Sequence, residues 1–200
     1  MCIRDSNTPV SNDGTDLGSR VVGSGALAQS FTISNTGDAA LTVNTITLSG
    51  AQAGDFSISG ATLPKVLSPN SAFTFTLNFT PGAVGPRSAT VNITNNDNDE
   101  NPYTFAVQGT GTQHKLTTNK TGNGTGSITL SPAGGNYNHN TIVTVTAKAD
   151  AGSTFGGWSG DCNGTGACSV TMTSAKSVTA TFSKNGSGNA QTVYLPIITK

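Results

Sequence analysis

Two cysteines, Cys162 and Cys168, are the residues whose type and spacing most clearly indicate chemistry in this sequence. The segment between them, Asn-Gly-Thr-Gly-Ala, is short and contains two glycines, which suits a hairpin-sized disulfide loop. A zinc site is the competing interpretation, because thiolates bind zinc, but its tetrahedral ligand set would have to recruit His114 or His139. We therefore favour a disulfide and, with it, an oxidising compartment.

A second cluster is the polar run Asn95–Asn101, which contains Asp97, Asp99 and Glu100. Calcium takes oxygen ligands, so these carboxylates are a candidate calcium loop, although their spacing is not that of an EF-hand. The alternative is a polar hairpin turn, since Asn and Asp side chains bond to nearby backbone in turns. We favour the turn and predict no other metal site.

Trp158 is the only tryptophan of the chain and lies in a Gly-Trp-Ser-Gly sequence. An exposed indole can stack on a sugar ring, whereas a buried one anchors a small core. Because one aromatic residue makes no binding platform and an indole has a large apolar area to hide, we favour the core position. Trp158 nevertheless remains the candidate ligand-stacking residue.

No group of residues has the spacing of a catalytic centre. His114 and His139 lie in an expected linker and an expected turn, and no Gly-x-Ser-x-Gly elbow occurs. Glu100 is the only glutamate, and glycoside hydrolysis needs two carboxylates that face a cleft. Asp55 and Asp161 are the aspartates near aromatic residues, and no second carboxylate accompanies either. We predict a chain that is not an enzyme and uses no cofactor.

The composition favours an all-β protein. Only 10% of the residues are charged, well below the quarter or so that is usual in soluble domains. Helix surfaces are normally rich in Glu, Lys and Arg, while the abundant Thr suits strands and the 25 Gly suit turns. The formal net charge is zero, which argues against a nucleic-acid partner. No apolar run approaches the roughly 20 residues that span a bilayer.

Alternating apolar residues predict several short strands within residues 17–112. The clearest run is Phe73–Phe79, where every second residue is apolar and one face is therefore buried. The segment Leu41–Leu48 changes phase between Val43 and Ile46, which predicts a β-bulge or bend. The same alternation occurs at Phe31 and Ile33, at Ala89, Val91 and Ile93, and at Tyr103, Phe105 and Val107. Six or seven strands at this spacing predict an immunoglobulin-like β-sandwich.

A second pattern of strands begins after Gln113–Lys115, which we interpret as a short linker. Glycine-rich turns are expected at Gly122–Gly126 and Gly134–Asn136. The alternating pairs and triplets are Ile128 and Leu130; Val143, Val145 and Ala147; Val170 and Met172; and Val178, Ala180 and Phe182. Residues 113–184 therefore predict a small β module stapled by the Cys162–Cys168 disulfide.

The first module resembles a known family. Phe31-Thr-Ile-Ser-Asn-Thr-Gly37, Asp55-Phe-Ser-Ile58, Phe79-Thr-Pro81, Val91-Asn-Ile-Thr-Asn-Asn-Asp97 and Val107-Gln-Gly-Thr-Gly111 look like the choice-of-anchor D domain of bacteria, which is similar to Hydin-type immunoglobulin-like modules. The resemblance implies a repeated module of secreted or surface proteins and supplies no catalytic residue.

The second module also resembles a known family. Its Phe155-Gly-Gly-Trp-Ser-Gly-Asp-Cys162 segment, the second Cys168 and the closing Ser177-Val-Thr-Ala-Thr-Phe182 strand look like the bacterial repeat domain of the divergent internalin-B type. The resemblance implies a small β module of surface proteins.

The two ends are expected to lie outside these modules. Residues 1–16 read as an unstructured or artefactual leader, because no apolar segment precedes Cys2 as a lipoprotein signal requires. Residues 185–200 read as a linker with a short apolar tail at 191–198. We interpret the chain as a fragment whose export signal lies upstream, and we place it outside the cell or on its surface.

Two functions are compatible with this sequence. The first is a structural spacer within a larger bacterial protein, whose partners are the neighbouring domains of the same polypeptide. The second is an adhesion module that binds a cell-surface polysaccharide or protein. A weaker third hypothesis is an intracellular scaffold, which the expected disulfide disfavours.

Overall fold

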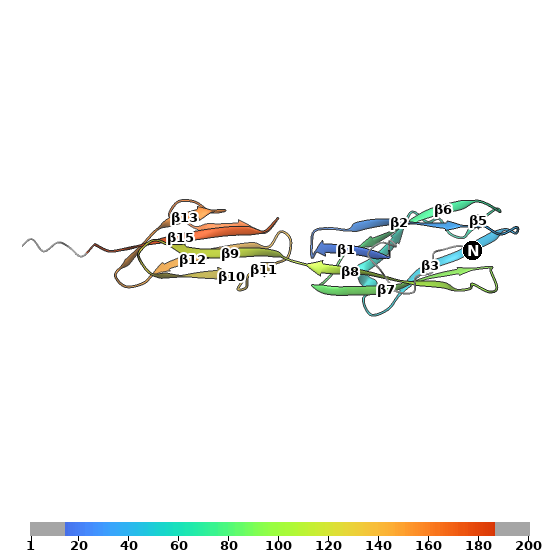
Figure 1. Cartoon of the computed structure of the whole chain (residues 1–200), viewed down its shortest axis with the longest axis horizontal. Helices are drawn as coiled ribbons and strands as arrows, with labels where there is room; N and C mark the ends of the chain where they lie inside the picture. The colour runs from blue at the N-terminus through green and yellow to red at the C-terminus, as the bar shows by residue number, and fades with distance from the viewer. Residues whose placement is uncertain (1–14, 187–200) are drawn as a thin grey trace, which may run out of the picture. The chain divides into compact units, whose positions relative to one another are not determined.

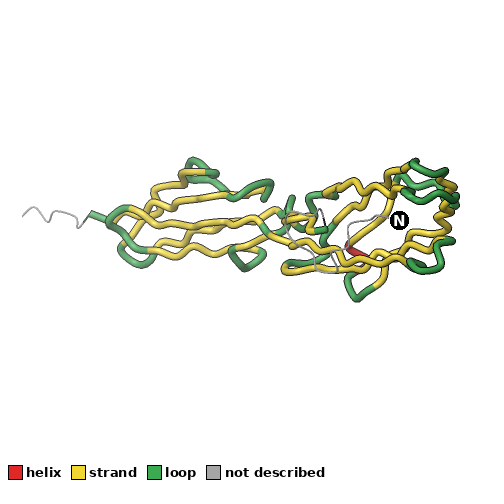
Figure 2. Tube along the Cα trace, turned by 45° about the vertical axis from the view of Figure 1, so that its right-hand side comes forward, coloured by secondary structure: helices red, strands yellow, loops and turns green. Residues whose placement is uncertain are grey.

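The computed structural model describes residues 15–186, so the sequence-based leader and tail fall mostly outside the described residues. Strands make up nearly all the regular structure, and the short red segment in Figure 2 is the 3-10 turn η1 (Ala53–Asp55). The all-β class expected from the composition is confirmed. Over the range 15–186 there is no helix of the length and hydropathy that crossing a membrane requires.

The first half of the chain forms a sandwich of two sheets (Figure 1). The five-stranded sheet has the order β1 (Asp16–Val21), β8 (Tyr103–Thr112), β7 (Gly85–Asn95), β3 (Leu41–Ser49) and β5 (Lys65–Leu67). The three-stranded sheet has the order β2 (Leu27–Ser34), β6 (Ala72–Phe79) and β4 (Phe56–Ser59). The pair β1–β8 is parallel, and the other pairs are antiparallel. This arrangement confirms the immunoglobulin-like sandwich.

The core of this sandwich is built from the alternating residues. Phe75, Leu77 and Phe79 of β6 are at most 1% exposed, as a period of two predicts for a strand with one buried face. Phe79 stacks on Phe56 of β4 with ring centroids 5.0 Å apart. In β3 the pairing with β7 shifts register between Val43 and Thr45. The predicted bulge is therefore confirmed, and it explains the change of apolar phase along this strand.

The second half forms another pair of sheets. One has the order β11 (Asn136–Tyr137), β9 (His114–Thr121), β15 (Lys176–Lys184) and β13 (Ser153–Gly160). The other has the order β10 (Gly126–Ser131), β12 (Ile142–Ala149) and β14 (Cys168–Thr171). Val143, Val178 and Phe182 are at most 1% exposed, so this half has its own apolar core. The pair β9–β15 is parallel.

Two segments differ from the sequence-based expectations. The expected linker Gln113–Lys115 is wrong, because β8 ends at Thr112 and β9 begins at His114, which leaves one residue between the strands. Asp16, assigned to the leader, begins β1, and the backbone carbonyl of Thr15 already accepts a hydrogen bond from Gln108. Strands β1 and β9 were missed because few of their residues are apolar and the alternation is correspondingly weak.

Candidate functional site

The most site-like feature of the second half is a pair of aromatic rings on β13. Phe155 and Trp158 are three residues apart, an odd spacing that puts two side chains on opposite faces of a regular strand. A bulge between Phe155 and Gly157 changes this, so that the two residues pair with Phe182 and Ala180 of β15. Those partners are two apart and share a face, and the two rings meet edge to face at 5.0 Å.

A groove of about 280 Å³ lies beside these rings. Trp158 is 7% exposed and Phe155 is half-buried, so Phe155 offers the more accessible face. The groove is also lined by residues 144–147 of β12 and by residues 165–168 of the cysteine loop. Aromatic faces beside threonine hydroxyls can contact a sugar ring, while the depth of Trp158 suits its role in the core.

The cysteine loop forms one wall of this groove. Cys162 and Cys168 are joined by a disulfide with 5.7 Å between their Cα atoms, which confirms the predicted bond. Cys168 is buried in β14, whereas Cys162 follows the end of β13. The backbone N–H of Trp158 donates to the carbonyl of Gly164 at 2.7 Å. The disulfide and this hydrogen bond together hold the loop against β13.

The polar run Asn95–Asn101 forms the turn between β7 and β8, as the hairpin interpretation predicts. Asn95 is 3% exposed and organises the turn: its Oδ1 accepts from the N–H of Asp97 at 2.7 Å, and its Nδ2 donates to the carbonyl of Glu100 at 3.0 Å. This run and the loop 35–41 line a hollow of about 370 Å³. Amide side chains therefore set the shape of this end of the sandwich.

The candidate calcium residues lie at the edge of that hollow. A hydrogen bond between the carboxyl groups of Asp97 and Asp99 raises the pKa of Asp97 and lowers the pKa of Asp99. Both residues line the hollow, and Glu100 follows them in the turn. Over the described range, no three side chains of the types Asp, Glu, His or Cys gather as a metal-binding group. The calcium loop stays a prediction.

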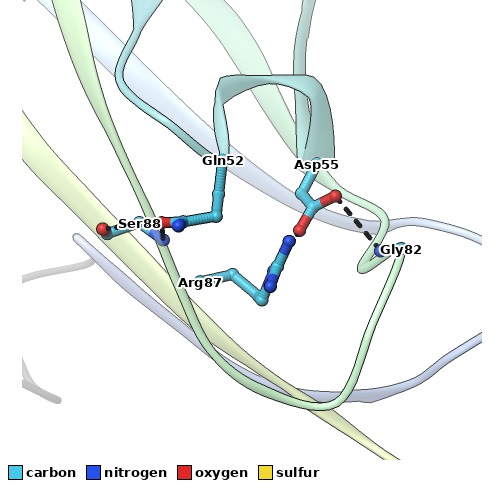
Figure 3. A network of polar contacts seen from close by, with 5 residues as sticks. All are labelled: Gln52, Asp55, Gly82, Arg87 and Ser88. Atoms are coloured by element: carbon cyan, nitrogen blue, oxygen red, sulfur yellow. Dashed lines mark hydrogen bonds and ion pairs between the residues drawn. The ribbon is translucent and has the colours of Figure 1, made fainter.

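Asp55 belongs to a network that braces the first sandwich (Figure 3). Its Oδ1 accepts from the N–H of Gly82 at 3.1 Å, and its Oδ2 pairs with Nε of Arg87 on β7. Beside it, the Gln52 side-chain carbonyl accepts from the N–H and hydroxyl of Ser88, both at 3.3 Å. The network joins three segments: η1, the turn that follows β6, and strand β7. Asp55 therefore holds three segments together.

Asp161 has a comparable place in the second half. Its two carboxylate oxygens accept from the N–H of Ser177 at 2.7 Å and from Nζ of Lys176 at 2.9 Å. The backbone hydrogen bond, followed by the lysine contact, lowers the pKa of Asp161. Its own N–H donates to the carbonyl of Ser177 at 2.9 Å. Asp161 thus fixes the end of β13 to the start of β15.

The two histidines meet, which sequence spacing did not indicate. Nε2 of His114, at the start of β9, lies 3.1 Å from Nδ1 of His139, in the turn after β11. One imidazole N–H donates to the other ring, and both rings are half-buried. Each histidine therefore has the other as a hydrogen-bond partner.

Sequence reasoning found some of these features and missed others. It placed the disulfide and the polar hairpin, and it singled out Trp158. It missed the contact of Phe155 with Trp158, because that contact depends on the bulge at Gly157. The local signal in the sequence is the glycine pair before Trp158, since Gly157 adopts a positive φ of 136°, a backbone shape that glycine favours.

Family comparisons match both halves of the chain. Residues 9–110 match the model described as HYDIN/CFA65/VesB-like, Ig-like domain. Residues 114–186 match the Divergent InlB B-repeat domain. The two resemblances to Hydin-type and divergent internalin-B modules are therefore confirmed. A comparison with curated proteins finds no match.

Solved structures with a similar chain path include two proteins of Vibrio cholerae. VesB protease has 18% identity and a TM-score of 0.37, and the match covers 48% of this chain and 29% of the VesB chain. Secreted serine protease VesC has 10% identity and a TM-score of 0.40, with 80% of this chain and 43% of VesC covered. The ASH/PapD-like domain of human CEP192 has 11% identity and a TM-score of 0.36, with 56% and 96% covered.

Proposed function

The chain belongs to the HYDIN/CFA65/VesB-like family of Ig-like domains, and on that premise we propose that it is a non-catalytic spacer in a secreted or cell-surface bacterial protein. Its partners are the neighbouring domains of the same polypeptide. We further propose that the first half is of the choice-of-anchor D type, on the strength of the motifs around Phe31, Phe79 and Val107.

The observation that carries this proposal is that Asp55 and Asp161, the two aspartates near aromatic residues, are committed to the fold. Asp55 holds a backbone N–H and Arg87, and Asp161 holds a backbone N–H and Lys176. A general base must be able to reach a substrate proton, and a carboxylate held in this way is poorly placed for that role. These contacts suit a module whose task is to keep its shape.

The disulfide supports the proposed extracellular location. Short structural disulfides persist in oxidising compartments and are rare in reducing cytosol. The Cys162–Cys168 bond and the divergent internalin-B repeat both support a place outside the cell. Mass measurement of the exported protein with and without reductant tests this point, and two free thiols in the exported sample would contradict it.

We also propose the domain boundaries 17–112 and 113–184. Each segment has its own pair of sheets and its own apolar core, and Gln113 alone lies between β8 and β9. If the two segments fold independently, a polypeptide of residues 15–112 unfolds cooperatively by itself. A non-cooperative melt of that polypeptide would contradict the boundary.

The groove beside Phe155 and Trp158 favours a second candidate function, the binding of a surface carbohydrate. Its support is the aromatic pair at 5.0 Å and the threonines that share the lining. The volume of this groove, about 280 Å³, is slightly below the range of about 300–1,000 Å³ that is typical of small-molecule sites. We therefore rank carbohydrate binding below the spacer function.

One experiment separates the two functions. The full chain is applied to an array of bacterial and host glycans, beside Phe155→Leu, which removes the accessible ring, and Val66→Ala, an exposed change on β5 that serves as a control. The spacer function predicts no saturable binding by any of the three proteins. Binding that Phe155→Leu abolishes and Val66→Ala retains would replace the spacer function with the carbohydrate one.

A further inference from the structure

The first and last strands of the first sandwich lie side by side and run in the same direction (Figure 1). Asp16 lies opposite Gln108 and Val21 lies opposite Thr112. Backbone hydrogen bonds close the pair at both ends: Gln108 donates to Thr15 at 2.9 Å, and Val22 donates to Thr112 at 3.0 Å. The chain thus enters and leaves this sandwich through one parallel pair.

The second sandwich repeats this arrangement with different residues. Its first strand, β9, pairs in parallel with its last strand, β15. The register runs without a break from Leu116 opposite Lys176 to Thr121 opposite Thr181. By contrast, the β1–β8 pair shifts register between Asp16 and Ser19. Both sandwiches therefore connect their terminal strands directly, and the second connection is the more regular one.

The direction of these strands decides how a stretching force acts on them. Tension on the two chain ends pulls the first strand backward along its axis and the last strand forward. Between parallel strands these pulls are opposite and lie along the strands, so all the inter-strand hydrogen bonds are sheared together. Between antiparallel terminal strands the same tension would open the hydrogen bonds one after another. Breaking many bonds at once has the higher barrier, since each contributes separately.

The load also passes from one parallel pair to the next with little intervening chain. Strand β8 ends at Thr112 and β9 begins at His114. Tension along the chain therefore reaches β9 directly from β8 through Gln113. A connection of one residue adds almost no slack, because a residue spans at most about 3.6 Å.

Side chains reinforce the first pair and hold the last strand of the second. Nε2 of Gln108 on β8 donates to Oδ2 of Asp16 on β1 at 3.0 Å. In the second sandwich, Asp161 ties the start of β15 to the end of β13 through Ser177. That contact resists displacement of β15 relative to its other neighbour. Strands β1, β8 and β15 are therefore held by more than their backbone hydrogen bonds.

From this arrangement we propose that the chain bears tension: β1–β8 and β9–β15 are two shear clamps in series that keep both sandwiches folded while the chain is pulled from its ends. The proposal rests on the spacer function and specifies it, because it says under what load the spacing must be maintained. The load would arise where one end of the parent protein is anchored and the other is attached to a surface or a bound partner.

The test pulls one sandwich in two directions by single-molecule force spectroscopy. Cysteine handles are placed on the full chain with Cys2→Ser, and Lys115→Cys is common to both variants. The shear variant adds Lys184→Cys at the end of β15, and the peel variant adds Ala175→Cys immediately before the start of β15. The three handle positions are exposed, so the native contacts are the same in both variants and only the direction of force differs.

The proposal predicts a several-fold higher unfolding force for the shear variant, with an extension of about 200 Å that identifies the unfolding of this sandwich. Circular dichroism and mass measurement of the Cys162–Cys168 bond verify that both variants are folded before pulling. Equal forces in the two directions would overturn the proposal. The same comparison applies to the first sandwich, where handles that flank residues 15–112 apply shear and handles at the two ends of the β7–β8 hairpin apply peel. A shear force there as low as the peel force would also overturn the proposal.

The two proposals fail in different ways. If the chain binds a glycan through Phe155, the spacer function fails, whatever the unfolding forces are. If the shear and peel forces are equal and no ligand binds, the chain remains a spacer that carries no load.

Discussion

Reduction of the Cys162–Cys168 disulfide is a perturbation whose size follows from the structure. The bond closes a loop with a sequence separation of 6 residues and joins the end of β13 to β14. In the chain-entropy description, opening so short a loop lowers stability by about 2 kcal/mol. A module of this size has a marginal core, so that loss is a large part of its stability.

The corresponding change in melting temperature is measurable. In a domain of this length, 1 kcal/mol shifts the midpoint by roughly 4–8 °C, so reduction should lower it by about 10 °C. The first sandwich has no cysteine among its described residues and provides an internal control within the same molecule. Only the transition of the second sandwich should move.

The assay is differential scanning calorimetry of the full chain with and without a phosphine reductant, with mass spectrometry to show that the bond is open. Two transitions are expected in the oxidised protein, and the one that moves identifies the second sandwich. An unchanged thermogram after complete reduction would refute the reasoning. A single transition that shifts as a whole would show that the two halves unfold as one unit.

Three further predictions concern single residues. Gly109→Ala should lower the stability of the first sandwich by about 1–3 kcal/mol in urea unfolding, because a Cβ there would lie 2.5 Å from the buried ring of Phe79. The control Gly54→Ala, at a position with open space around it, should leave the stability unchanged. The lowered pKa of Asp161 means that its carboxylate stabilises the fold at neutral pH, and this stabilisation is lost as the pH falls through the folded pKa. Asp161→Asn should therefore flatten the dependence of stability on pH below about pH 4, and an unaltered dependence would contradict this. Chelator should leave the melting temperature of the first sandwich unchanged; a calcium-dependent shift that Asp97→Asn removes would instead establish the calcium loop.

Residues whose side chains alternate strongly were placed correctly from the sequence. Phe75, Leu77 and Phe79 are apolar at every second position, and burial of one face of β6 follows directly. The phase change after Val43 predicted the β3 bulge for the same reason, since an extra residue reverses the alternation. Local rules were sufficient where the apolar signal is continuous.

The features that sequence analysis missed depend on contacts between distant segments. Strand β9 has Leu116 as its only buried apolar residue, and its place is fixed by parallel pairing with β15, about 60 residues later. Likewise, the meeting of His114 with His139 depends on where β11 lies beside β9. No local pattern encodes either contact, so neither could be predicted from spacing alone.

Our central proposal is that charged side chains such as Asp55 and Arg87 brace the sandwiches, and a double-mutant cycle on these two residues tests it most directly. Asp55→Asn, Arg87→Met and the double variant are unfolded in urea at neutral pH. Bracing predicts that each single change is destabilising and that the pair couples by about 1–3 kcal/mol, because both side chains are largely shielded from water. Residues kept for function commonly cost stability. A stable or stabilised Asp55→Asn protein with no coupling to Arg87 would therefore contradict the account.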